Sequence, residues 1–340
     1  MDINHTDKKA HQPVLINSLI EKLPDIAGTW VDCTFGGGGY SEALLRAGAK
    51  KLIAIDTDPS VLNHARELKV RFGSKLELIE AKFSSLAEIV AKFELKKISG
   101  VVFDVGVSSM QIDVASRGFS FQKEGPLDMR MSQRGTTAAD IVNNSTEEEL
   151  ADIIFYYGED RSARIIARAI VRERNKKLIK TTDHLSEVVN RVVRQKNFKI
   201  KANFNPATRT FQALRIAVND ELEELHSGLV AAEKVLDLGG VLAVVSFHSL
   251  EDRLIKQFIK TRSSDSSGQS RYLPDKTSPK PTFKQLFNKV VKPNFKEISQ
   301  NPRARSAKLR VGIKISSNHE PNKLPKIRFP QVKFTTGLNS

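Results

Sequence analysis

The 340-residue chain contains a single cysteine, Cys33. One thiol excludes a disulfide framework and any zinc site built on two or more cysteines, and it is typical of a reducing compartment. No apolar run approaches the ~20 residues that a membrane-spanning helix needs, and the first residues lack the apolar core of a secretory signal. The histidines and carboxylates show no metal-ligand spacing. We therefore expect a cytoplasmic protein with no membrane segment and no bound metal.

Acidic residues are also scarce, since 39 of them face 54 basic residues and leave a net charge of +15. The excess is unevenly distributed. Residues 256–340 hold 19 basic and 4 acidic side chains, whereas residues 1–255 are neutral overall. Inside the neutral part, residues 161–201 carry 13 basic and 3 acidic side chains. Two basic blocks on a neutral body indicate a polyanionic partner, although solvated lysine-rich faces would give the same count.

Strand and helix patterns alternate over the first hundred residues. Four apolar runs predict strands and three amphipathic segments predict helices between them, which together indicate a parallel, doubly wound α/β sheet. The strands are expected at 29–34, 51–55, 76–79 and 100–103, and the helices at 41–47, 59–69 and 86–93. From 113 to 204 only helix signals are convincing, among them the capping box Thr146-Glu-Glu-Glu149. We therefore expect an inserted all-helical domain.

The α/β pattern resumes at Asn205-Pro206, where a helix start leads into one long amphipathic helix that ends before Gly239-Gly240. Later runs predict a fifth strand at 241–247, a helix at 250–260, and strands near 286–292 and 307–315. We therefore assign 1–112 and 205–316 to the two parts of the sheet domain, 113–204 to the helical insertion, and 317–340 to a disordered basic tail.

A glycine block at 36–39 follows the first strand and precedes a helix, an arrangement that cradles nucleotide-like ligands. The dinucleotide fingerprint is absent, because Ser41 stands where its third glycine is required. Asp56, at the end of the second strand, suits ribose hydroxyls, and Asp32 adds a carboxylate that would suit a cationic group. These features favour the cationic cofactor S-adenosylmethionine over NAD; a plain tight turn is the simpler alternative.

Six longer motifs occur in a fixed order along the chain. They are Asp104-Val-Gly-Val-Ser-Ser-Met-Gln111, Arg117-Gly-Phe-Ser-Phe121, Gly125-Pro-Leu-Asp-Met-Arg-Met131, Asn205-Pro-Ala-Thr-Arg-Thr-Phe-Gln212, Ser246-Phe-His-Ser-Leu-Glu-Asp-Arg253 and Asn301-Pro-Arg-Ala-Arg-Ser306. Over residues 11–315 the chain closely resembles the bacterial MraW (RsmH) family of 16S ribosomal RNA (cytosine-N4)-methyltransferases. The resemblance implies a class I S-adenosylmethionine-dependent methyltransferase fold, which is Rossmann-like, with a helical insertion for substrate recognition. It also implies 16S rRNA as the partner, within the small ribosomal subunit.

The resemblance implies a set of cofactor-binding positions as well. They correspond here to Gly38, Gly39, Tyr40, Asp56, Phe83, Asp104 and Gln111. Tyr40 stands where many family members have histidine, so a side-chain role at that position is open. Phe83 would flank the adenine, and Asp56 would bind the ribose. Asp104 and Gln111 match the two ends of the fourth-strand motif.

Methylation of cytosine N4 needs a positioned acceptor, because the N4 lone pair is delocalised into the ring. A side chain that accepts a hydrogen bond from the amine would localise this pair and later take a proton. Asp104 and His248 are the candidates for this catalytic role, although His248 fits a packed core histidine equally well and Asp104 also suits the cofactor. Arg209, Arg303 and Arg305 are candidate contacts to RNA phosphates.

Several alternatives stay open at this point. A DNA amino-methyltransferase usually has two prolines after its fourth-strand acid, where this chain has Val105-Gly106; a protein substrate is the related alternative. A non-catalytic RNA-binding factor of ribosome assembly need not keep residues 36–39, Asp56 and Asp104. An NAD-dependent oxidoreductase lacks support because the third glycine is missing. The oligomeric state is undecided, with a dimer among the options.

Overall fold

The structure is a computed structural model that describes residues 13–23, 25–95, 97–196, 205–263, 280–317 and 327–333. The chain divides into two compact units. The first, which we call the sheet unit, comprises Met1–Asp56, Ser60–Val105 and Ser227–Ile327. The second, the helical unit, comprises Thr57–Pro59, Gly106–His226 and Arg328–Ser340.

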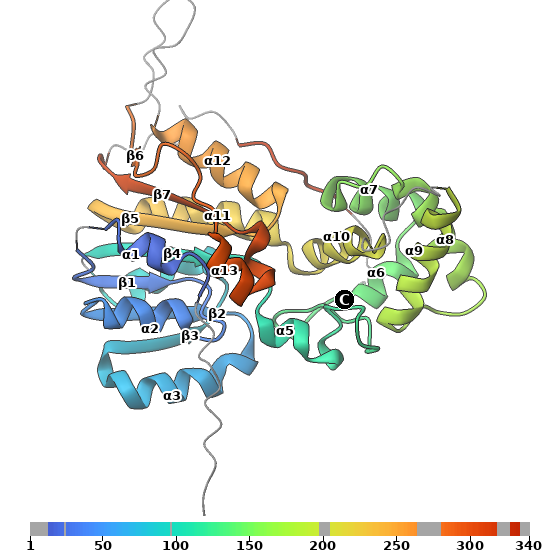
Figure 1. Cartoon of the computed structure of the whole chain (residues 1–340), viewed down its shortest axis with the longest axis horizontal. Helices are drawn as coiled ribbons and strands as arrows, with labels where there is room; N and C mark the ends of the chain where they lie inside the picture. Colours follow the sequence, from blue (N-terminus) through green and yellow to red (C-terminus); the bar gives the residue numbers. More distant parts are fainter. Residues whose placement is uncertain are drawn as a thin grey trace, which may run out of the picture. The chain divides into compact units, whose positions relative to one another are not determined.

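Seven strands form the sheet in the order β3-β2-β1-β4-β5-β7-β6 (Figure 1). The strands β1 to β5 pair in parallel, and β7 runs antiparallel to both β5 and β6. Their bounds are Thr29–Asp32 (β1), Lys51–Asp56 (β2), Leu76–Glu80 (β3), Ile98–Asp104 (β4), Leu236–Ser246 (β5), Phe283–Gln285 (β6) and Lys308–Lys314 (β7). This strand order is typical of class I methyltransferases, so the predicted fold class is confirmed.

Helices cover the sheet, so the side chains of its central strands are buried. α2 and α3 lie beside β1 to β3, and α12 packs against β5, β6 and β7 (Figure 1). The helices of this unit are Ile16–Ile20 (α1), Gly39–Arg46 (α2), Leu62–Phe72 (α3), Leu86–Lys92 (α4), Ser249–Ser263 (α12) and Phe295–Gln300 (α13), with short 3-10 turns at Gly73–Lys75 (η2), Phe83–Ser85 (η3) and Pro302–Ser306 (η6). Trp30 and Phe103 are fully buried, as expected for parallel strands with both faces covered.

The helical unit is built from amphipathic helices around an aliphatic core that includes Ile153, Ile170 and Leu214. Its helices are Ser109–Asp113 (α5), Ala138–Asn144 (α6), Glu147–Gly158 (α7), Ala163–Arg174 (α8), Thr182–Lys196 (α9) and Ala207–Asn219 (α10). The boundary between the units falls inside α11, Glu221–Val235. The predicted capping box at Thr146 is confirmed, because its side chain accepts from the Glu149 N–H at the start of α7.

The helical unit is larger than the predicted insertion. It includes residues 106–112 and 205–226, which the sequence pattern assigned to the sheet domain. The reason is that α10 packs against α7, and its side chains Phe211 and Leu214 are buried. The prediction of one long helix from 205 was wrong. Asp220 adopts the left-handed conformation with φ 55° and separates α10 from α11, and Gly239-Gly240 lie inside β5 instead of ending a helix.

The C-terminal part of the chain also differs in detail. β7 confirms the last predicted strand, whereas the preceding strand is the short β6 and not 286–292. Within that range, Val291 forms an isolated bridge with Leu309, and the Leu286 N–H donates to the Val311 carbonyl. The predicted tail, 317–340, lies mostly outside the described residues; within it, the Val332 N–H donates to the Tyr157 hydroxyl over 3.0 Å. Among the described helices, none combines the length and the apolar character required to cross a membrane.

Candidate active site

Four candidate residues follow the carboxyl ends of neighbouring strands in the sheet unit. Asp56, Asp32 and Asp104 end β2, β1 and β4, and His248 comes two residues after β5. These strands are adjacent in the sheet. Ligands of open α/β sheets bind at this edge, so the residues lie where a cofactor and a substrate would meet.

The glycine loop connects β1 to α2 and is held by Asp56. The Gly36 N–H donates to Asp56 Oδ2 over 2.7 Å. Gly38 has φ 77°, and a Cβ at this position would lie 2.3 Å from Leu68 Cδ1, so no other residue fits without rearrangement. A Cβ on Gly37 would meet no atom within 4 Å. The loop therefore leaves open space beside its backbone, and Asp56 orients it in addition to its expected role toward ribose.

Tyr40 is part of the packing around this loop. Its side chain is 3% exposed, and its hydroxyl donates to the Val14 carbonyl. Burial raises the pKa of Tyr40 well above its ordinary value. Gly39, the preceding residue, is close to Pro13, which a Cβ would approach to 3.2 Å. The tyrosine at this position thus anchors the segment before α1.

Two carboxyl groups meet at the ends of β1 and β4. Asp32 is fully buried, and its two oxygens accept from the Ser41 hydroxyl (2.7 Å) and the Thr34 N–H (3.1 Å). Burial raises the pKa of Asp32 to about 6. The hydroxyl of the same Thr34 accepts the Asp104 N–H over 2.6 Å, so one threonine connects the two acids.

Asp104 is the group in this cluster that lacks a partner for its carboxyl. The residue is half-buried, and its Oδ1 is buried without a hydrogen bond to any described residue. Burial, together with the negative charges of Asp32 and Glu251, raises the pKa of Asp104 to about 8. A cationic ligand beside these carboxyls would favour their ionised forms. The pair therefore has the chemistry of a cation-binding site.

His248 is fixed by Glu251 at the start of α12. Glu251 Oε2 accepts the N–H groups of Phe247 (2.8 Å) and His248 (3.1 Å), while the Glu251 N–H donates to His248 Nδ1 (3.4 Å). This is the reciprocal pattern of a capping box. His248 Nε2 lies 2.9 Å from Glu251 Oε1. Despite this short distance, Nε2 is buried without a hydrogen bond to any described residue.

Phe83 lies in η3, directly after β3. Its ring packs edge-to-face on Phe103 with centroids 5.5 Å apart, and a Cβ on the neighbouring Gly228 would approach it to 2.7 Å. The ring is half-buried at this edge of the sheet. It is held in place by aromatic and backbone contacts, which suits a side chain that flanks a flat ligand.

Gln111 belongs to the helical unit, and both ends of its amide are engaged there. Its Oε1 accepts the Ser108 N–H (3.0 Å) in the capping box of α5, and its Nε2 donates to Asp58 Oδ2 (2.8 Å). Arg117 Nη1 binds the same carboxylate oxygen at 2.8 Å. Sequence reasoning missed this cluster of Asp58, Gln111 and Arg117, although Ser108-x-x-Gln111 carries a capping signal.

The three candidate phosphate contacts divide between the units. Arg209, on α10, donates to the Glu159 carbonyl over 3.1 Å inside the helical unit. Arg303 and Arg305 are exposed side chains of η6 in the sheet unit. The three arginines are therefore contributed by both units.

Comparisons with known proteins agree with this arrangement. The family model described as the MraW methylase family matches residues 8–315. Three curated relatives are each named ribosomal RNA small subunit methyltransferase H. The one from Bradyrhizobium diazoefficiens is 50% identical over 90% of this chain and 92% of that protein. Those from Methylobacterium sp. and Cereibacter sphaeroides are 50% identical (89% of this chain, 90% of that protein) and 46% identical (93% of each). From its fold, its carboxylate-rich strand ends and this similarity, the chain belongs to the MraW methylase family.

Proposed function

We propose that this protein transfers a methyl group from S-adenosylmethionine to the exocyclic N4 amine of a cytidine in 16S rRNA of the small ribosomal subunit. The observation that carries the proposal is the pair Asp32 and Asp104, two acids with raised pKa values beside an open glycine loop. The name shared by the relatives supports the ribosomal RNA substrate. The reaction would take place in the cytoplasm, with the small subunit.

The residues of the sheet unit fit a cationic cofactor. Asp104 Oδ1 is buried without a partner in the described chain, and Asp32 places a second acid nearby. An anionic pyrophosphate would be repelled at this position, whereas a ligand with ammonium and sulfonium charges would be attracted. When bound, S-adenosylmethionine supplies an electrophilic methyl group. Asp56 would bind the ribose and also keep the glycine loop in place through Gly36.

Asp104 is the proton acceptor that the geometry favours. A positive charge bound beside it would lower its pKa from about 8 and leave the carboxylate ionised at neutral pH. The ionised group can accept a hydrogen bond from the N4 amine, localise its lone pair and then take the proton. His248 is less suited to this step, because its Nδ1 accepts the Glu251 N–H and Glu251 Oε1 lies 2.9 Å from its Nε2. We assign His248 to positioning the end of β5.

The experiment uses the full chain, radiolabelled S-adenosylmethionine and small ribosomal subunits from a bacterium that lacks its own copy of the gene. The expected product is one labelled cytidine in 16S rRNA, identified as N4-methylcytidine by mass spectrometry of the digested RNA. Cofactor binding is measured in parallel by calorimetry. Protein that binds the cofactor but labels DNA, protein or no cytidine would contradict the proposal.

A further inference from the structure

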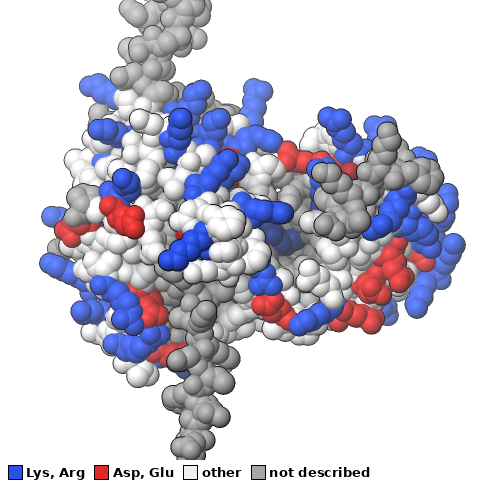
Figure 2. Space-filling model, in the orientation of Figure 1, with Lys and Arg blue, Asp and Glu red and all other residues white. Residues whose placement is uncertain are grey.

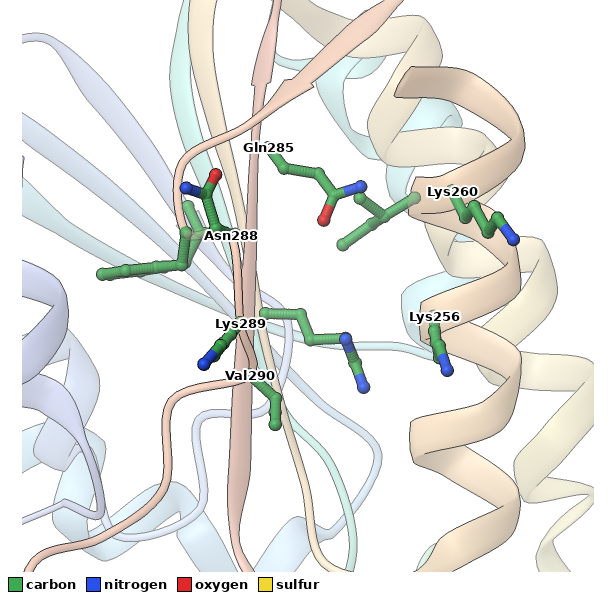
Figure 3. A pocket seen from close by; sticks show the side chains of 10 residues that line it. Lys256, Lys260, Gln285, Asn288, Lys289 and Val290 are labelled. Atoms are coloured by element: carbon green, nitrogen blue, oxygen red, sulfur yellow. The ribbon is translucent and has the colours of Figure 1, made fainter. Parts of the chain in front are cut away.

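A basic hollow lies between α12 and the β6–β7 edge of the sheet unit (Figure 3). Its volume is about 140 Å³. Four cationic side chains line it, together with two amides and four apolar side chains, and no carboxylate. The cations are Lys256, Lys260, Lys289 and Arg310, and the amides are Gln285 and Asn288. Figure 3 shows Gln285 extending toward α12, where Lys256 and Lys260 lie one turn apart.

The positive charge at this hollow is only partly compensated. Asp252 accepts from Arg310 and from Lys308, both over 2.8 Å. Lys256 and Lys289 are exposed, and neither forms an ion pair within the described ranges of the chain. Figure 2 shows Lys and Arg side chains gathered over the part of this unit where Figure 1 places α12. A concave basic surface of this kind attracts a polyanion.

An exposed aromatic ring follows the hollow along the chain. Phe295, the first residue of α13, is 86% exposed. The lysines Lys292 and Lys296 on either side of it are exposed as well. Cationic side chains interleaved with an accessible aromatic ring form the typical surface for single-stranded nucleic acid, because the lysines contact phosphates and a base stacks on the ring.

Hydrogen bonds connect this segment to the candidate active site. Glu297, two residues after Phe295, accepts the Leu15 N–H at Oε1 over 3.1 Å. The carbonyl of the neighbouring Val14 accepts the hydroxyl of Tyr40, which belongs to the glycine loop region. At its other end, the segment is joined to β7 through the pairing of Val291 with Leu309. The segment 289–297 thus carries both Phe295 and part of the lining of the hollow. Its end at Glu297 is hydrogen-bonded to Leu15, next to the residue that Tyr40 contacts.

We propose that the hollow and the segment 289–296 bind single-stranded RNA on the side of the sheet unit, with phosphates at Lys256 and Lys289 and a base stacked on Phe295. This inference rests on the proposed function, since the bound strand would flank the methylated cytidine. The proposed surface lies beside the predicted RNA contacts Arg303 and Arg305, because η6, which carries both arginines, packs against α13. The contact is made by this unit alone.

The test measures binding of a fluorescein-labelled 20-nucleotide oligouridylate to the full chain by anisotropy over a range of salt concentrations. The variant K256Q/K289Q removes two charges at the proposed surface. The matched control K75Q/K92Q removes two exposed lysines from η2 and α4, neither of which lines the hollow. We expect the slope of log Kd against log salt to fall by about 1.4 in the first variant, for two phosphate contacts of a single strand. The control keeps the slope of the unmodified protein.

Phe295 is tested separately from charge. F295A should weaken oligouridylate binding roughly ten-fold, as expected for the loss of one base-stacking contact. F295L should weaken it similarly, because leucine is apolar but has no aromatic face, whereas F295W should retain binding. Equal binding by F295A and F295W, an unchanged salt slope in K256Q/K289Q, or displacement of the RNA by polyglutamate as efficiently as by unlabelled oligouridylate would each overturn the inference.

Cofactor affinity, measured by calorimetry, should be unchanged in all these variants. The two proposals can fail independently. RNA binding that depends on Phe295 without any methyl transfer would contradict the proposed function and support the inference. Methyl transfer by a protein whose oligouridylate binding does not depend on Phe295, Lys256 and Lys289 would support the proposed function and contradict the inference.

Discussion

Asp32 and Asp104 are linked through Thr34, whose N–H donates to the first carboxylate and whose hydroxyl accepts the backbone N–H of the second. The charge of Asp32 adds to burial in raising the pKa of Asp104 to about 8. Without a cation, Asp104 Oδ1 is buried without a hydrogen-bond partner in the described chain. With a cation, both acids can ionise in a site of low polarity, which is why we regard the pair as the centre of the cofactor site.

Cofactor affinity should depend on pH. Below about pH 8 Asp104 is largely protonated in the free protein, and a bound cation favours its ionised form, so binding releases a proton. Affinity should therefore rise with pH and level off above about 8. Calorimetry at pH 7 in buffers of different ionisation enthalpy would detect the released proton. An affinity that stays constant between pH 6 and 8.5 would refute this linkage. In D104N, most of the pH dependence of cofactor affinity should be absent.

The stability of the cofactor-free protein should depend on the same acid. A carboxyl whose pKa is raised in the folded state stabilises the fold at low pH, and this stabilisation is lost as pH rises from about 4 through about 8. D104N cannot ionise, so its free energy of unfolding should improve relative to the unmodified protein by up to about 4 kcal/mol between pH 5 and 8.5. Denaturant titrations at several pH values test this, and parallel pH profiles for the two proteins would count against it.

Asp56 should have two separable roles. Its Oδ2 accepts the Gly36 N–H, which an asparagine oxygen can also do and an alanine cannot. We expect D56N to weaken cofactor binding about ten-fold through the lost charged hydrogen bond to ribose, and D56A to weaken it further because the loop is released. Calorimetry gives the affinities, and a D56N protein with unaltered affinity would leave Asp56 only its loop role.

The two neighbouring glycines of the loop provide a matched comparison. An alanine at position 38 would need φ 77° and would clash with Leu68, whereas an alanine at position 37 meets no atom within 4 Å. G38A should therefore lose about 1–3 kcal/mol of stability, and G37A should unfold like the unmodified protein. Thermal unfolding of the free proteins measures both. Equal stability of the two variants would mean that the loop conformation differs from the one described.

The strand ends of the sheet could be predicted from the sequence, but several contacts could not. Apolar runs that end in an acid mark Asp32, Asp56 and Asp104, and parallel pairing then brings them to one edge. The break at Asp220 escaped prediction because the apolar spacing continues across it, while the left-handed backbone of one residue leaves no periodic signal. The short β6 escaped because its pairing with β7 is a tertiary contact.

The contacts of His248 in the candidate site also could not be predicted from the sequence. Sequence reasoning singled out this histidine but not Glu251, because capping boxes are recognised by a serine or threonine at the first position. Asp252 and its partner Arg310 lie 58 positions apart, so only the folded chain brings them together. The basic hollow depends on that long-range contact and was visible beforehand only as an excess of lysine and arginine.

The most direct test of the account compares the unmodified protein with D104N on small ribosomal subunits, with 16S rRNA analysed by mass spectrometry. We expect N4-methylcytidine at one position with the unmodified protein. We expect a loss of at least about 100-fold in rate with cofactor-saturated D104N, in line with the removal of a general base. N4-methylation that proceeds equally well in D104N, or a methyl group found on another atom, would contradict it.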